Sequence, residues 1–393
     1  MCIRDRYALL ACGLVGLVWR SFRGTAGSNR LGRVGLALAA VVAAAALSLL
    51  WTVDIEKGAY AMVAYYLPLG VLAALIGERR LTATYAARLA ALQVAVACVL
   101  AAVALYEWQT RHLYFNEKLI TTNAYTTFFR VNSLIFDPSL YGRSAMLALL
   151  TCAAVLVLAP PSRRALAAAV ALPLIAAGLF VTYSQSSLVA LVFGCLAIAA
   201  VAWPRRALIG SVVLVVALSA GALALPQTRR ALSSNPLNKL SSSRLGLAER
   251  GGDAFLRHPL QGVGLGGYSV AASRTGNVHS KLAPHDVLVE TASEEGLLGL
   301  AALAAFAWTV VAAIRAPRRE HDRVVRTVIA IELGAIAIHS LAYDTFFEDP
   351  LTWAFAAFLA AGAAASVPAA ATGPATALDA PDPPGVAIEA AGS

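Results

Sequence analysis

Long apolar runs recur along the whole chain, separated by short polar breaks. A helix crosses the bilayer core with about 20 apolar residues, and the sequence contains eleven runs of about that length. They lie near residues 7–19, 31–53, 58–76, 86–106, 144–160, 165–183, 187–203, 207–225, 296–314, 325–343 and 350–367. This pattern predicts an all-α polytopic membrane protein.

Basic residues fall in alternate breaks between these runs. One set of breaks holds Arg20, Arg23, Arg30, Arg33, Arg79, Arg80, Arg88, Arg163, Arg164, Arg205, Arg206, Arg315, Arg318, Arg319, Arg323 and Arg326. The short breaks of the other set hold only Lys57. Because cytoplasmic loops carry the excess of Arg and Lys, we expect segments 107–143 and 226–295, and the turn Ser184–Ser187, to lie outside the cell.

The predicted spans and loops divide the chain into six parts. These are N-terminal transmembrane helices (1–106), a first external loop (107–143), further transmembrane helices (144–225), a large external catalytic loop (226–295), C-terminal transmembrane helices (296–367) and a disordered cytoplasmic tail (368–393). Eleven spans place the N-terminus outside, although Met1–Arg6 carries no translocation signal. We therefore expect an incomplete N-terminus and twelve spans in the intact protein.

Composition supports the membrane assignment and excludes several other classes. The chain has 59% hydrophobic and 13% charged residues, whereas soluble domains have about 25% charged residues. The net charge is +9, but no clustered basic stripe indicates nucleic-acid binding. The five cysteines show no CxxC spacing, so neither a zinc site nor a disulfide framework is predicted.

The first external loop ends in polar residues that precede a new helix. Asp137 followed by Pro138 is typical of a helix start, with Asp as the cap and Pro in the first turn. Arg130 and Arg143 are candidates for binding a diphosphate, because a guanidinium group can bind phosphate oxygens in pairs. The alternative is that both side chains extend to lipid phosphates.

The second external loop is about 70 residues long, which is far beyond an ordinary connection. Apolar residues at helical spacing predict an amphipathic helix from Arg244 to Arg257, lying along the outer surface. A glycine-dense turn follows at 262–267, whose backbone N–H groups could face an anion. No predicted strand precedes this turn, so it is not a dinucleotide-binding fingerprint.

His285 lies where the second external loop meets the next predicted span. An imidazole with an ordinary pKa of about 6.5 is suited to take a proton from a sugar hydroxyl near neutral pH. Asp286, Glu290, Glu294 and Glu295 follow within three turns. These carboxylates either orient His285 or cap and charge the start of the helix.

Two ionisable residues fall inside a predicted span. Glu332 and His339 lie seven residues apart on one helical face, with acidic residues just beyond at 344–349. Ionisable residues in the membrane are costly and often functional, so a secondary transporter or glycolipid exporter is an alternative function. The purely structural interpretation is that Glu332 makes a polar contact between helices and that the other residues are solvated at the membrane interface. A non-catalytic scaffold is a third possibility.

Three motifs together resemble the O-antigen ligase and O-antigen polymerase family. They are Arg130 to Gly142 with its Asp-Pro pair, His258-Pro259-Leu-x-Gly262-x-Gly264, and His285-Asp286 followed after nine residues by Gly296-x-x-Gly299. Their order, spacing and predicted external placement fit the family over roughly 120–300. The resemblance implies about twelve membrane helices and a large periplasmic loop, similar to the GT-C class of glycosyltransferases.

The resemblance also implies an activity. Such proteins act in the bacterial plasma membrane, facing the periplasm. They transfer a glycan from an undecaprenyl-diphosphate donor to a lipid, glycan or protein acceptor hydroxyl, with inversion and without a metal or another cofactor. By this resemblance His285 acts on the acceptor hydroxyl, while Arg130 and Arg244 bind the diphosphate, with Arg143 assisting them. Asp137, Asp286 and Glu294 are possible supporting residues.

Two departures from the family pattern bear on this assignment. Asp286 stands where the family histidine is usually followed by Asn, Ser or Gln, and its charge favours the protonated imidazole. The turn Ser184–Ser187 lacks the arginine that many members carry after the serine. Ligase, polymerase and protein O-oligosaccharyltransferase activities all remain open.

Overall fold

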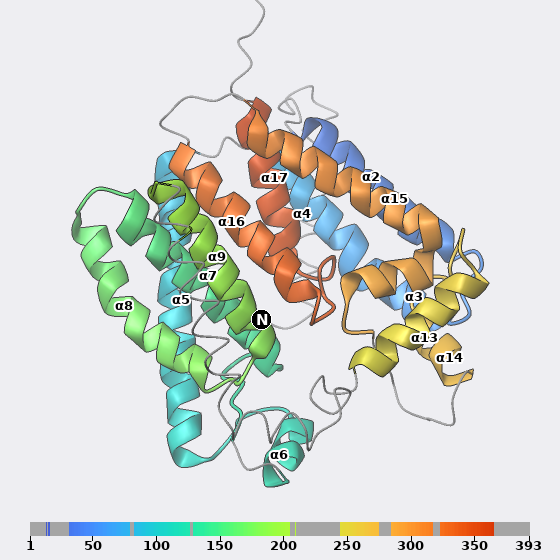
Figure 1. Ribbon diagram of the computed structural model, residues 1–393, viewed down its shortest axis with the longest axis horizontal. Coiled ribbons are helices and arrows are strands. Elements are labelled where there is room, and N and C mark those ends of the chain that lie inside the picture. Colours follow the sequence, from blue (N-terminus) through green and yellow to red (C-terminus); the bar gives the residue numbers. More distant parts are fainter. Residues whose placement is uncertain are drawn as a thin grey trace, which may run out of the picture.

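The computed structural model describes residues 13, 15, 31–78, 82–125, 129–204, 209, 244–274, 284–316 and 323–364. Every regular element in these ranges is a helix (Figure 1). The all-helical fold predicted from the apolar runs is therefore confirmed for the described part of the chain.

Among the described residues, six helices are long and apolar enough to cross a membrane. They are Ile55–Gly77, Thr84–Thr110, Pro138–Leu158, Arg163–Phe180, Gln185–Ala202 and Val287–Arg315. The runs near 7–19 and 207–225 lie outside the described residues, apart from residues 13, 15 and 209. Of the other predicted spans, α2 (Gly32–Ser48) and α17 (Pro350–Ala364) are shorter, and α16 (Arg323–Ser340) carries three charged side chains. The predicted number of eleven spans is not confirmed.

The helices pack in two groups that α16 joins. In one group α7 packs against α5, α8 and α9, and in the other α17 and α15 pack against α2, with α4 on α17. Helix α16 contacts α7 and α9 of the first group and α17 of the second. The bounds are α4 Leu67–Gly77, α5 Ala83–Thr110, α7 Pro138–Leu158, α8 Arg163–Phe180, α9 Gln185–Ala202 and α15 Val287–Arg315.

Small residues allow α7 to approach its neighbours closely. A Cβ atom at Gly194 of α9 would lie 2.5 Å from a methyl carbon of Leu150. One at Gly178 of α8 would collide with the hydroxyl group of Tyr141 in α7. Close backbone approach through small residues is how helices pack where the hydrophobic effect cannot drive their association.

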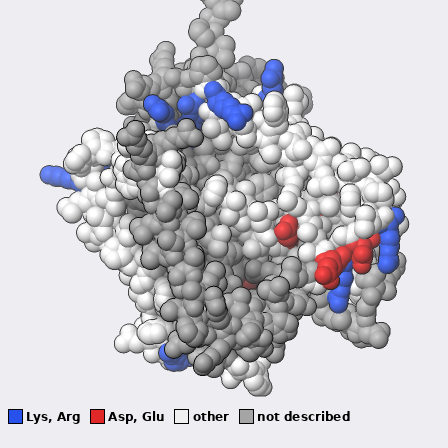
Figure 2. Space-filling model, viewed as in Figure 1, with Lys and Arg blue, Asp and Glu red and all other residues white. Residues whose placement is uncertain are grey.

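The shorter helices lie mainly beside the loops that the sequence places outside the cell. They are α3 (Ile55–Ala61), a π-helical turn (Met62–Tyr66), α6 (Glu117–Ala124), α13 (Arg244–Arg257) and α14 (Tyr268–Arg274). The predicted amphipathic helix from Arg244 to Arg257 is confirmed as α13, which packs on α15. Figure 2 shows Lys and Arg side chains gathered near the opposite end, where α15 ends and α16 begins.

Helix α15 is interrupted at Gly296. Its dihedral angles there are φ 65° and ψ −151°, a conformation available essentially only to glycine. The N–H of Leu297 donates instead to the carbonyl of Pro259, at 2.8 Å. The helix thus begins at Val287, ahead of the predicted start at 296.

Candidate functional site

His285 lies immediately before helix α15. Its backbone has φ 57°, the left-handed region that few non-glycine residues adopt, and its side chain is half-buried. The imidazole ring centre is 6.2 Å from that of Tyr343. The loop therefore holds His285 in an uncommon conformation against a residue far away in the sequence.

Asp286 and Asp137 are both helix caps. The carboxylate of Asp286 accepts hydrogen bonds from the N–H groups of Leu288 and Val289, at 2.8 and 3.2 Å. Asp137 accepts from Ser139 and Leu140, at 2.7 and 3.3 Å. The predicted helix start at Asp137 is confirmed, and Asp286 is directed toward its own helix.

Glu294 holds the glycine-dense turn in place. Its carboxylate accepts from the N–H groups of Gly266 at 2.8 Å and Tyr268 at 3.0 Å, and its carbonyl accepts from Gly264 at 2.8 Å. The other N–H groups of the turn donate to His258, Ser293, Ser48 and Gly264. The expectation that this turn presents its N–H groups to an anion is wrong, because the protein itself uses them.

Arg143 is buried rather than positioned at the lipid headgroups. Its side chain is 5% exposed, and its Nε lies 3.1 Å from a carboxylate oxygen of Asp349. It also donates through Nη1 to the hydroxyl of Thr345, at 2.8 Å. The guanidinium group thus ties α7 to the segment between α16 and α17, and the idea that it extends to lipid phosphates is wrong.

Arg130 and Arg244 occupy different surroundings. The Nε of Arg130 donates to the carbonyl of Thr182 at 3.0 Å, and its backbone bonds to the side chain of Asn123. Arg130 therefore lies against the segment that leads into the Ser184–Ser187 turn. Arg244 begins α13, and its side chain is outside the described part of the structure.

The segment 341–349 between α16 and α17, which we call the C-terminal linker, joins several of these residues. The ring of Tyr343 is 6.2 Å from His285 and 5.8 Å from His339, and Asp344 hydrogen-bonds to Glu290. Thr345 and Asp349 of the linker bind the side chain of Arg143. The linker thus contacts the start of α15, the end of α16 and α7. Sequence reasoning assigned no catalytic part to this linker, although three acidic residues between two apolar runs marked it.

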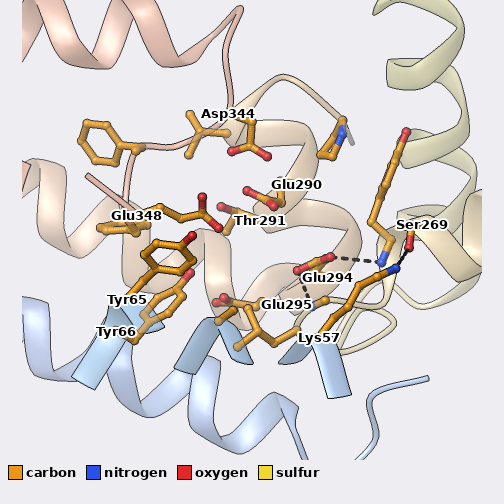
Figure 3. Close-up of a pocket in the computed structure, with 18 of the residues that line it drawn as sticks. Lys57, Tyr65, Tyr66, Ser269, Glu290, Thr291, Glu294, Glu295, Asp344 and Glu348 are labelled. Atoms are coloured by element: carbon orange, nitrogen blue, oxygen red, sulfur yellow. Dashed lines mark hydrogen bonds between the residues drawn. The ribbon is translucent and has the colours of Figure 1, made fainter. Parts of the chain in front are cut away.

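A cavity of about 330 Å³ opens beside the C-terminal linker (Figure 3). Five acidic side chains line it, from α15 and from the linker: Glu290, Glu294, Glu295, Asp344 and Glu348. Pro284 and Val287, which flank His285 and Asp286, also line it. The cavity therefore adjoins the predicted catalytic histidine.

Burial raises the pKa of the two linker acids that line this cavity, Asp344 and Glu348, so both are protonated more readily than in water. It raises the pKa of Glu348 to about 7, with the charge of Asp344 adding to the effect and Arg143 opposing it. Burial also raises the pKa of Asp344, although its hydrogen bond with Glu290 acts in the opposite direction. Two carboxyl groups that share a hydrogen bond must hold a proton between them.

Glu332 and His339 make contacts between helices. Glu332 accepts hydrogen bonds from Thr151 of α7 and Gln93 of α5, which confirms the interhelical interpretation for this residue. His339 is 0% exposed and bonds through Nε2 to the hydroxyl of Ser186, at 3.1 Å. Interfacial solvation was the wrong expectation for His339.

The comparisons with known proteins agree with the resemblance seen in the motifs. Residues 169–304 match a family model described as O-antigen ligase. No curated protein sequence matches the chain. The matched range contains α13, the glycine-dense turn and His285, whereas Arg130, Arg143 and the C-terminal linker lie outside it. The chain is thus a multi-pass membrane protein with an O-antigen ligase domain over residues 169–304.

Proposed function

We propose that this protein is an inverting glycosyltransferase at the outer face of the bacterial plasma membrane. It moves a glycan from an undecaprenyl-diphosphate donor to a hydroxyl group of a lipid, glycan or protein acceptor. The observation that carries the proposal is the position of His285. This residue belongs to the O-antigen ligase domain, adjoins a cavity, and is held by its backbone and by Tyr343.

The reaction is a single displacement. The imidazole of His285 takes the proton of the acceptor hydroxyl, and the oxygen forms a bond to the anomeric carbon of the donor sugar. The bond from that carbon to the diphosphate oxygen breaks, and its electron pair leaves with undecaprenyl diphosphate. Attack opposite to the leaving group inverts the anomeric configuration.

The leaving diphosphate needs charge stabilisation rather than a proton. Arg130 and Arg244 supply it in this proposal, because guanidinium groups pair well with phosphate oxygens. Arg143 has a different part, since its guanidinium group already binds Asp349 and Thr345. It acts by holding the C-terminal linker next to the site. The proposed chemistry calls for no metal or other cofactor.

The test is a transfer assay with purified protein in lipid nanodiscs and an undecaprenyl-diphosphate glycan. Lipid, glycan and peptide acceptors are compared in the presence of EDTA. We choose His285→Asn because asparagine tolerates the left-handed backbone that His285 adopts. The exposed His112→Asn is the matched control.

We expect product in EDTA for the wild type and for His112→Asn. The rate of His285→Asn should fall by about 10²–10⁴-fold, the usual contribution of a general base. Transfer by His285→Asn at the wild-type rate would remove His285 from the mechanism. Arg244→Ala should also lose activity, because the diphosphate loses a counter-charge.

The transporter alternative rests on Glu332 and His339. Both are engaged between helices, with Thr151, Gln93 and Ser186 as partners. Their positions therefore favour a structural part for both residues, and Glu332→Gln is expected to keep glycan transfer in a folded protein.

A further inference from the structure

The cavity beside His285 is lined by more acidic than basic side chains. Among the described residues that line it, five are acidic and Lys57 is the one basic residue. The ammonium group of Lys57 is already paired with Asp54 at 3.0 Å, and it donates to the hydroxyl of Ser269. Lys57 is therefore not available to neutralise the deeper carboxylates.

Most of the acidic residues have partners. Glu294 accepts from the glycine-dense turn, Glu290 and Asp344 share a hydrogen bond, and Arg143 lies close enough to Glu348 to lower its pKa. Figure 3 shows Glu290, Asp344 and Glu348 on one side of the cavity, and Glu295 nearer to Tyr66.

Glu295 is the exception. Its side chain is 6% exposed and lines the cavity. Among the described residues, burial and the nearby charge of Glu294 act on its carboxyl group, and neither a hydrogen-bond donor nor a cation does. A buried carboxyl group without a hydrogen-bond partner is costly, so this group indicates that a ligand supplies hydrogen-bond donors or positive charge at this point.

Aromatic rings line the same cavity. They are Tyr60, Tyr65, Tyr66, Tyr268, Phe346 and Phe347. Aromatic rings attract cations over their faces, and they also pack against apolar ligand surfaces. Rings and carboxylates together form a site typical of an organic cation, in which the charge faces the carboxylates and the carbon skeleton packs on the rings.

A metal ion fits this cavity less well than an organic cation. In the described residues, no group of three or more His, Cys, Asp or Glu side chains is arranged to hold a metal. The carboxylates are spread around a space of about 330 Å³, which is in the size range of small-molecule sites, about 300–1,000 Å³. An organic ligand would fill this space.

We infer that this cavity binds the glycosyl acceptor through a protonated amino group on its terminal sugar, with Glu295 as the counter-ion. The inference rests on the proposed glycosyltransferase function. The amino group would bind between the rings and Glu295. Because Pro284 and Val287 line the cavity on either side of His285 and Asp286, the acceptor's hydroxyl groups would then lie on the His285 side.

The experiment measures binding without any donor, so that it is independent of transfer. Isothermal titration calorimetry at pH 7 and low salt compares glucosamine with glucose and N-acetylglucosamine on the nanodisc-embedded protein. Glu295→Gln removes the charge with little change of shape, and Glu348→Gln removes a charge from the other side of the cavity. Glu117→Gln, exposed on α6, is the matched control.

We expect glucosamine to bind at least tenfold more tightly than either neutral sugar to the wild type and to Glu117→Gln. In Glu295→Gln this preference should disappear, while Glu348→Gln, with its thermal unfolding midpoint checked, should weaken glucosamine binding by a smaller factor. Equal affinities for the three sugars, no binding of glucosamine, or a full preference in Glu295→Gln would each overturn the inference.

The two proposals can fail separately. Transfer to neutral acceptors without any binding of glucosamine would overturn this inference and leave the proposed function standing. Selective binding of glucosamine by a protein that transfers no glycan would overturn the proposed function and support an amino-sugar site.

Discussion

Arg143 and Asp349 form a buried ion pair between residues 206 positions apart, which connects α7 to the C-terminal linker. Both side chains are almost fully buried, at 5% and 7% exposed. Removing one member of such a pair leaves an uncompensated charge in the interior, at a cost of about 3–5 kcal/mol. Replacing both members by apolar residues of similar volume costs much less, because no charge is left behind.

We therefore predict that Arg143→Ala and Asp349→Ala each lower the free energy of unfolding by about 3–5 kcal/mol. The double variant Arg143→Met with Asp349→Leu should lower the free energy of unfolding by less than either single variant does. Thermal unfolding in a single detergent measures these differences, and Arg257→Ala on the exposed face of α13 is the control. A double variant as unstable as the sum of the singles would contradict this account of the pair.

At the scale of elements, the break in α15 shows how backbone geometry positions the glycine-dense turn. A Cβ atom at Gly296 would lie 2.6 Å from the carbonyl oxygen of Leu260 and 2.7 Å from the nitrogen of Gly262. These are backbone atoms of the loop that enters the glycine-dense turn, so they cannot move aside cheaply. The break in the helix and the position of the turn therefore depend on each other.

Gly296→Ala should destabilise the protein by more than the roughly 1–3 kcal/mol of backbone strain alone, because the added methyl group also collides with the loop. The matched control is Gly252→Ala in α13, where a Cβ atom would meet nothing within 4 Å. This control should be neutral, or up to about 1 kcal/mol more stable, because alanine favours a helix. Unfolding midpoints and the yield of folded protein compare the two variants, and equal losses would argue against the close fit at Gly296.

At the scale of the whole molecule, the acidic cavity makes stability depend on pH. Burial raises the pKa of Glu348 from 4.5 to about 7, so the folded protein holds this proton more tightly than the unfolded chain. The free energy of unfolding must then fall as the pH rises from about 4.5 to about 7, and it is constant with respect to this group above that range. The raised pKa of Asp344 acts in the same direction.

Glu348→Gln should therefore reduce the drop in unfolding midpoint between pH 5.5 and pH 8, and the variant should be more stable than wild type at pH 8 by a few °C. Glu117→Gln should keep the wild-type pH dependence. Differential scanning fluorimetry of the three proteins across this range makes the comparison. An unchanged slope in Glu348→Gln would show that Glu348 is not the group that titrates.

Local patterns predicted local features well. The apolar runs predicted the helices, the Asp137-Pro138 pair predicted a capped helix start, and helical spacing predicted α13. These features depend on neighbouring residues, which the sequence displays directly. His285 was chosen for its place at the start of a helix and for the family motif, and its catalytic part stays a prediction.

Long-range pairings were not predictable from the chain alone. From the sequence we expected Arg143 to lie at the surface and the acidic residues of the linker to be solvated. In the structure, Arg143 binds one of these acids, Asp349, in the interior. The turn 262–267 showed its glycines but not that Glu294 would occupy its N–H groups. In each case the partner lies at least 26 residues away, and nothing in the local pattern marks it.

The C-terminal linker also sets the order in which the site can be completed during synthesis. A ribosome makes the chain from its N-terminus, so the whole O-antigen ligase domain, ending at residue 304, is synthesised before Tyr343 and Asp349. Until the C-terminal linker is made, Arg143 lacks its Asp349 counter-ion and His285 lacks the neighbouring Tyr343 ring. The cluster around His285 thus stays incomplete while the chain is being made. Under the proposed glycosyltransferase function, the growing chain then has no finished site when it meets lipid-linked glycans in the membrane.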